Sequence, residues 1–168
     1  MKKTIFPIVQ LAVLITAIIV FHSNCSPAQQ SSSTAASSEE VVKAINDDHW
    51  VFTANRAMPQ RGKTQMLTGG YEVECKGDTL ISYLPYFGRA YSASYGSTTS
   101  ALDFKSTNFG YTKQKDSKGA WNVTIKPADY KEVQSMFFTV YENGSAQLNV
   151  QCTNREPISF SGTVAKKK

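Results

Sequence analysis

Apolar and polar residues alternate along several short segments of the chain, which is typical of β-strands that bury one face. The segment from Ala146 to Cys152 shows this most clearly, because Ala, Leu, Val and Cys alternate with Gln and Asn. The same period of two recurs in segments 71–75, 121–125 and 158–164, and turn-forming sequences such as KDSKG separate them. The pattern predicts a mainly β domain, an antiparallel sandwich or partly closed barrel of about eight strands.

One hairpin has a predictable register. The sequence MFFTVYENGSAQLNVQC contains two strand patterns around a turn. A two-residue turn at Asn143-Gly144 would place the apolar residues of the first strand opposite polar residues of the second. A three-residue loop, 142–144, instead gives one continuous apolar face and puts Gly144 in the left-handed region. We therefore expect the three-residue loop, with a shared face formed by Met136, Phe138, Val140, Ala146, Leu148 and Val150.

A short helix is predicted before the first strand. Ser38 is a suitable N-cap, and Glu39 and Glu40 follow in the first turn, where the helix dipole favours acidic side chains. Val41, Val42 and Ile45 form its apolar stripe. The sequence HWVFTA, which follows, has the composition of a strand.

The first 24 residues have the features of an export signal. Lys2 and Lys3 precede an apolar run at 5–21, which small and polar residues follow. Cys25 then resembles the lipidated cysteine of bacterial lipoproteins, although His22 and Asn24 depart from the usual Leu and small residue. The alternatives are an uncleaved anchor or an ordinary cleaved signal that leaves Cys25 as a spare thiol.

The rest of the chain divides into three parts. Residues 25–37 are rich in Ser, Ala and Gln and are expected to be a flexible tether. Residues 38–165 form a single β-rich domain, and 166–168 are a basic tail, expected to be solvated or in contact with anionic lipid. We expect an exported protein that is attached to the membrane through lipidated Cys25, facing the periplasm at the outer membrane.

The charge distribution excludes one class of partner. The formal charge of +5 comes from the two ends, because residues 25–165 hold 13 basic and 13 acidic side chains. No basic stripe is interleaved with aromatic residues, so no nucleic-acid partner is predicted.

The residues that usually carry chemistry are few. His49 is the one histidine after the export signal, and neither a nucleophile–base pair nor metal-binding spacing is present. The protein is therefore predicted to be no enzyme and to need no metal or cofactor. Cys75 and Cys152 both lie on apolar strand faces, and in an exported protein we expect them to form a disulfide. The alternative is two buried free thiols.

The segment YLPYFGRAYSASYG, residues 83–96, is unusually rich in aromatic residues. Pro85 must end or bend the preceding strand, and Gly88 allows another turn. This segment, with LDF at 102–104, GSAQLNV at 144–150 and REPISFSG at 155–162, resembles the domain-of-unknown-function 4251 family. That family consists mostly of lipoproteins of Bacteroidetes. The resemblance implies an exported lipoprotein with a β-rich domain and supplies no activity.

Two interpretations of this motif stay open. In the first, its side chains form a recognition surface, since Tyr and Arg dominate binding interfaces and aromatic rings stack on sugars. In the second, Phe87 and Tyr91 fill the core and Arg89 pairs with a carboxylate such as Asp103. The candidate binding residues are Tyr83, Tyr86, Phe87, Arg89, Tyr91 and Tyr95.

The expected function is a lipid-anchored, non-catalytic module that binds a protein, a glycan or another envelope component. The alternatives are a structural or assembly partner of an envelope complex and a hydrolase with an unrecognised site.

Overall fold

The computed structural model describes residues 38–91 and 100–167, so the predicted signal, the tether, Cys25 and Tyr95 lie outside the described residues. Helix α2 (Ser38–Asn46) comes first within these ranges. Ten strands follow: β1 (His49–Pro59), β2 (Gln65–Met66), β3 (Glu72–Lys76), β4 (Thr79–Leu84), β5 (Leu102–Ser106), β6 (Phe109–Lys115), β7 (Trp121–Pro127), β8 (Val133–Val140), β9 (Ser145–Cys152) and β10 (Ile158–Ala165).

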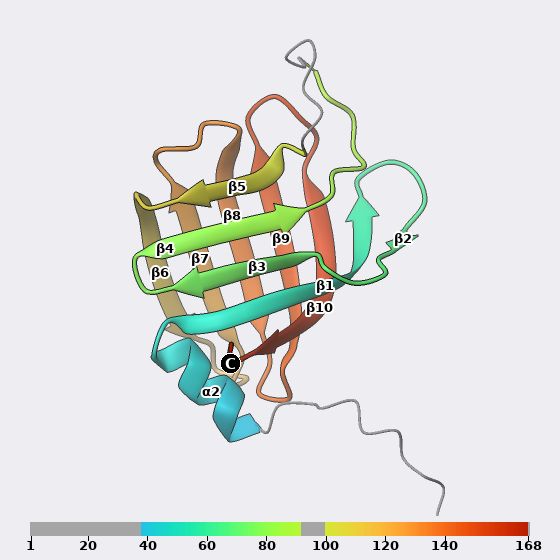
Figure 1. The fold of residues 1–168 in the computed structure, drawn as a ribbon. Helices are drawn as coiled ribbons and strands as arrows, with labels where there is room; N and C mark the ends of the chain where they lie inside the picture. Colours follow the sequence, from blue (N-terminus) through green and yellow to red (C-terminus); the bar gives the residue numbers. More distant parts are fainter. Residues whose placement is uncertain (1–37, 92–99, 168) are drawn as a thin grey trace, which may run out of the picture. The chain divides into compact units, whose positions relative to one another are not determined.

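All ten strands belong to one antiparallel sheet with the order β5-β4-β3-β1-β10-β9-β8-β7-β6, and β2 pairs only with β1. Figure 1 shows that the sheet folds over on itself, so that β5, β4, β3 and β1 cross in front of the strands β10 to β6. The two halves enclose the core between them. The result is a nearly closed, barrel-like sheet with one short helix, which confirms the predicted fold class.

Strand β1 makes the fold possible because it bends from one half of the sheet to the other. Its pairing with β10 shifts register between Ala54 and Arg56, which leaves Asn55 as the extra residue of a bulge. Before the bulge β1 also pairs with β3, and after it with β2. Gly162 of β10 lies opposite Ala54. A Cβ atom at Gly162 would lie 2.0 Å from the carbonyl oxygen of Thr53, so the bend requires glycine there.

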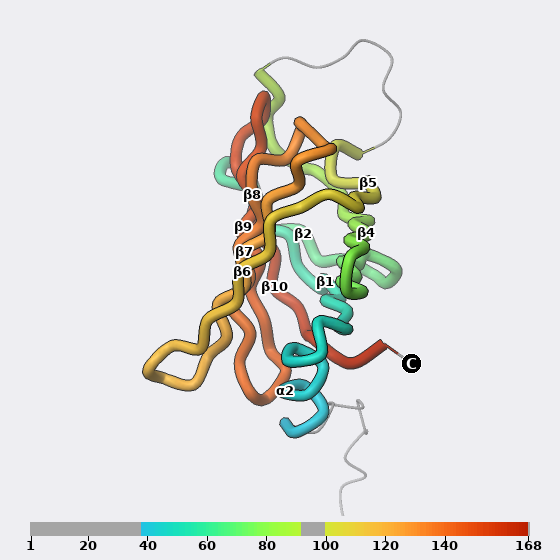
Figure 2. Tube along the Cα trace, turned by 90° about the vertical axis from the view of Figure 1, so that its left-hand side faces the viewer, coloured from blue at the N-terminus to red at the C-terminus, as the bar shows by residue number. Residues whose placement is uncertain are grey.

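The two edge strands of the sheet, β5 and β6, are consecutive in the sequence and are joined by Thr107 and Asn108 alone. The exposed carboxylate of Asp129 holds this turn, because it accepts hydrogen bonds from the backbone N–H groups of both residues and from the hydroxyl of Ser106 at 2.5 Å. These bonds, that of Ser106 first, lower the pKa of Asp129. In Figure 2 the strands diverge from this turn, so the barrel is joined at one end without being closed by pairing.

Helix α2 lies at the opposite end, beneath the two halves of the sheet (Figures 1 and 2). The helix ends where Asp48 adopts a left-handed backbone with φ 53°. Lys113 of β6 then satisfies the helix terminus: its ammonium group donates to the carbonyl oxygens of Ile45 and Asn46 at 2.8 and 3.1 Å and pairs with Asp48 at 2.8 Å. This side chain therefore connects an edge strand to the helix.

The predicted apolar stripe of the helix is partly correct. Val41 and Ile45 are fully buried, but the third buried residue is Ala44, and Val42 is only half-buried.

The predicted hairpin register is confirmed. Val140 pairs with Ala146, and the Tyr141 N–H donates to the carbonyl oxygen of Ser145, which leaves a three-residue loop that ends at Gly144 with φ 80°.

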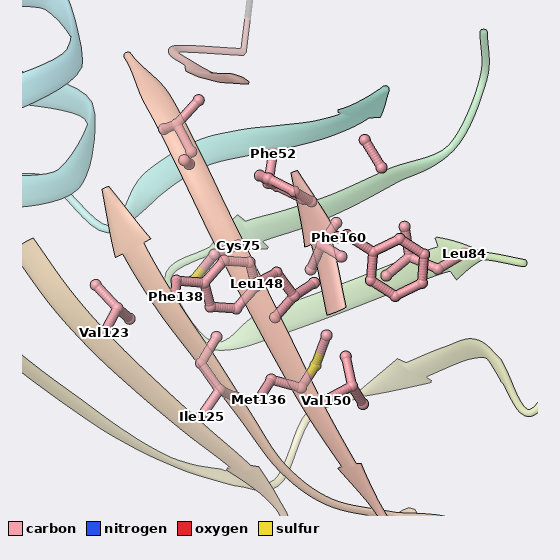
Figure 3. Packing of buried hydrophobic residues seen from close by; sticks show 14 of the residues in the cluster. Phe52, Cys75, Leu84, Val123, Ile125, Met136, Phe138, Leu148, Val150 and Phe160 are labelled. Atoms are coloured by element: carbon pink, nitrogen blue, oxygen red, sulfur yellow. The ribbon is translucent and has the colours of Figure 1, made fainter. Parts of the chain in front are cut away.

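The core is complete within the domain. Its buried members begin at Val41 and end at Val164, and Phe52, Phe138, Leu148 and Phe160 are at most 1% exposed (Figure 3). All of these core residues belong to one compact unit, which begins at residue 34. We therefore expect a domain of residues 34–168 to fold by itself. No helix in the described ranges is long and apolar enough to span a bilayer.

The predicted disulfide between Cys75 and Cys152 is absent, because both cysteines are buried free thiols. In the sheet order, β1 and β10 separate the two strands that carry them. Their surroundings also differ. Cys75 pairs across the sheet with Trp50 near Asp48 and Lys113, whereas Cys152 lies near Arg155 and Glu132. Figure 3 shows Cys75 among the residues of the core.

The two thiols are expected to react with a disulfide reagent such as DTNB only when the domain unfolds. Burial raises the pKa of Cys75 to about 12 and that of Cys152 to about 11, so both stay protonated at neutral pH. Since an unfolded thiol loses its proton near pH 9, the free energy of unfolding should fall between about pH 9 and 12. Rapid labelling of the native 34–168 domain at pH 8, at the rate seen in urea, would contradict this.

Candidate functional site

The aromatic motif forms a folded-back segment at the end of β4, opposite the helix end of the barrel (Figure 1). Strand β4 ends at Leu84, directly before Pro85, as predicted. The side chain of Tyr86 then lies over Gly88. A Cβ atom at Gly88 would be 2.3 Å from the Tyr86 hydroxyl, so a larger residue at this position would displace the Tyr86 side chain.

Tyr86 fastens the motif to the β9–β10 connection. Its hydroxyl shares its one proton between two carbonyl oxygens, that of Arg89 at 3.0 Å and that of Glu156 at 2.8 Å. The backbone adds two bonds, from the Glu156 N–H to the Arg89 carbonyl and from the Tyr91 N–H to the Asn154 carbonyl. Burial raises the pKa of Tyr86 to about 12, which keeps the hydroxyl protonated as a donor. The described part of the motif is therefore held at Tyr86, Arg89 and Tyr91.

This anchoring leaves most of the predicted site residues on the surface. Tyr83 is 50% exposed, Phe87 45% and Tyr91 72%, and Arg89 is exposed as well. The interpretation in which Phe87 and Tyr91 fill the core is wrong, because both are exposed. Among the described candidate binding residues, Tyr86 is the one that packs against the core. The expected ion pair between Arg89 and Asp103 is also absent among the described residues.

Tyr83 lies on the outer face of β4 and has a defined environment. Its ring stacks on that of Tyr71, with centroids 5.6 Å apart and planes inclined by 17°. Its cross-strand neighbours are Glu72 on β3 and Asp103 on β5. The outer face of this half thus carries an aromatic pair between two carboxylates.

An ionic cluster in which only Glu156 is buried lies beside Tyr86 of the motif, and the sequence did not reveal it. The guanidinium of Arg155 lies 5.3 Å from the centre of the Tyr86 ring, and its Nε atom is 3.7 Å from Glu132 Oε2. Glu156 is 2% exposed, and its nearest cation is the exposed Arg61 at 3.6 Å. Within the described residues, Arg155 Nε and Glu156 Oε2 have no hydrogen-bond partner. This cluster depends on Arg61, Glu132 and the β9–β10 connection coming together, which no local pattern indicates.

Removal of the Tyr86 hydroxyl tests whether the motif depends on this anchor. We expect Tyr86→Phe to lower the free energy of unfolding by about 1–2 kcal/mol, because a half-buried donor to two carbonyl oxygens is lost. Tyr91→Phe is the matched control, since that ring is exposed, and should change the thermal midpoint little. Equal midpoints for both variants would show that the hydroxyl contributes nothing to the fold.

The described residues bring together surface aromatic rings and charged groups. Among them no three side chains of His, Cys, Asp or Glu are arranged to hold a metal ion. His49 is exposed, and its Nδ1 atom donates to the carbonyl oxygen of Asp47 at 2.7 Å. Chemically, the described part of the motif presents exposed aromatic rings and one exposed guanidinium, that of Arg89.

Comparison with known proteins places the chain in a family. Residues 32–164 match the family described as "Domain of unknown function (DUF4251)". The chain belongs to this family. A crystal structure of a DUF4251 family protein from Bacteroides eggerthii DSM 20697 is similar, with a TM-score of 0.57 and 17% identity over 79% of this chain and 89% of that one. At this identity the likeness shows the DUF4251 fold alone. No curated protein matches the chain.

Proposed function

We propose that this DUF4251 protein is a non-catalytic binding module of the bacterial cell envelope, exported and attached through lipidated Cys25 to the periplasmic side of the outer membrane. The observation that carries the binding role is the motif itself. Tyr86 and Gly88 hold its backbone against the β9–β10 connection, while Phe87, Arg89 and Tyr91 remain exposed. A rigid backbone that presents aromatic and arginine side chains loses little conformational entropy on binding.

The anchoring part of the proposal rests on the sequence. An apolar segment at 5–21 precedes Cys25, and the polar tether at 26–37 separates that cysteine from the folded domain. Several acyl chains on one cysteine are sufficient for stable membrane attachment. The test is mass spectrometry of the full chain expressed in a Bacteroides host. Acyl groups on Cys25 are expected, and their loss in Cys25→Ser should release the protein from the membrane fraction.

The binding role is tested with envelope extract and the immobilised 34–168 domain. We expect the domain to retain a component that Phe87→Ala and Tyr91→Ala do not retain, at unchanged thermal midpoints. Tyr141→Ala is the matched control, because Tyr141 is 44% exposed but lies after β8, in the other half of the sheet. Protease treatment of the extract distinguishes a protein component from a glycan. Equal retention by all variants would exclude the motif as the binding surface.

A further inference from the structure

A hollow in the described surface lies beside the end of helix α2, where Asp47 lines it. It has a volume of about 840 Å³ and runs along the outer face of β3. Ile81 of β4 forms an apolar part of its lining, and Asp47, Glu74 and Lys76 contribute charges. Ile81 is 39% exposed, which is high for an aliphatic side chain in a strand.

The chain's own C-terminal tail occupies one side of this hollow. Lys166 and Lys167, which follow the end of β10, are both among its lining residues. The ammonium group of Lys167 forms a close hydrogen bond with Glu74 and lies 3.9 Å from Glu72. The hydrogen bond to Glu74 raises the pKa of Lys167, so the side chain is charged throughout the physiological range. The basic tail was expected to be either solvated or in contact with anionic lipid. Simple solvation does not describe Lys167, because its ammonium group is paired with Glu74.

The contact of Lys167 with Glu74 and Glu72 can break without disturbing the core. The tail lies beyond the last β10 residue that pairs with β1, Ala165, and the side chain of Lys167 remains 46% exposed. Exposed ion pairs of this kind contribute little stability. A competing cation from another molecule therefore has only a small free energy to overcome.

The hollow becomes acidic once the tail has left. Asp47 and Glu74 then remain on its lining with Glu72 beside it, against the single cation Lys76. We propose that this hollow is a docking groove for a basic, extended segment of a partner protein, and that the C-terminal lysines are an intramolecular competitor for it. The Lys167 ammonium shows where a lysine or arginine of the partner binds, and Ile81 provides apolar contact for the stem of that side chain. The hollow adjoins the motif at Tyr83, because Glu72 pairs with that residue across the sheet. The inference does not use the exposed Phe87, Arg89 and Tyr91, which carry the binding role proposed above.

The test measures binding of a fluorescein-labelled peptide of alternating lysine and serine to the 34–168 domain by fluorescence anisotropy. Neutralising the tail with Lys166→Gln and Lys167→Gln should tighten binding by about two- to five-fold. The control variant, Lys118→Gln with Lys126→Gln, removes the same charge from exposed positions elsewhere. Salt near 1 M should abolish binding to both.

A second pair of variants identifies the groove itself. In the tail-neutralised domain, Glu74→Gln should reverse the gain, whereas Glu142→Gln should not, although Glu142 also pairs with a lysine. Thermal midpoints verify that each variant is folded. The proposal is overturned if the tail and control variants bind the peptide equally, or if Glu74→Gln has no effect. It is also overturned if the tail lysines hold the domain on phosphatidylglycerol vesicles while the peptide does not bind, because the tail would then be a lipid contact.

Discussion

Replacement of Gly162 with alanine is expected to be among the most damaging single changes in this domain. The new methyl carbon would lie 2.0 Å from the carbonyl oxygen of Thr53 and 2.9 Å from its carbonyl carbon. Both belong to the backbone of β1, which cannot move aside without disturbing the bulge at Asn55. We expect a loss of roughly 3 kcal/mol or more in the free energy of unfolding, or failure to fold.

Urea unfolding of the 34–168 domain measures this loss, and Gly110→Ala is the matched control. Gly110 lies in edge strand β6, where an added Cβ atom meets nothing closer than 3.9 Å. That substitution should be close to neutral or slightly stabilising. If both alanine variants unfolded at the same urea concentration, the close approach of β10 to β1 would have no energetic importance.

Phe138→Ala should have an effect of similar size for a different reason. The ring comes from β8 in one half of the sheet and meets two rings of β1 in T-shaped contacts. Its centroid lies 5.0 Å from that of Trp50 and 5.7 Å from that of Phe52. Removal of the Phe138 ring breaks these contacts and also leaves a cavity between the two halves of the sheet. The expected cost is about 4 kcal/mol.

The neighbouring residue provides the control for this prediction. Phe137 faces outward and is 40% exposed, so Phe137→Ala removes the same atoms from the same strand without a cavity. It should cost less than about 1 kcal/mol. Comparable losses for both variants would mean that packing between the two halves is not what stabilises the barrel.

The sequence predicted strands and their register best where one face of a strand is buried and the other is exposed to solvent. In β9, Gln147 and Asn149 alternate with buried Leu148 and Val150, so the strand, its register and its loop could all be predicted. Strand β6 was missed, because it is an edge strand with little buried surface and a polar sequence, FGYTKQK. Strand β2 has two residues, too few for any period.

The site was harder to predict, because it depends on which segments meet. The alternation of buried and exposed residues along β4 could have predicted which motif side chains point inward. Leu80, Ser82 and Leu84 are buried, and the same period of two places Tyr86 inward and Phe87 outward, as observed. The bend expected at Pro85 obscured this continuity. The Cys75–Cys152 pairing failed because two apolar strand faces need not be adjacent, and the strand order of the sheet separates them.

The central position of the β1–β10 pair has a consequence for how the chain acquires its structure. Val51 pairs with Ala165, so the first and last strands of the domain are neighbours in the middle of the sheet. Contacts between residues so distant in sequence make folding slow, because the chain must close a long loop first. During synthesis, β1 lacks one neighbour until the last strand, β10, has emerged. A chain that stops before Ile158 would thus expose the edges of both β1 and β9, and such unpaired strands are prone to aggregate.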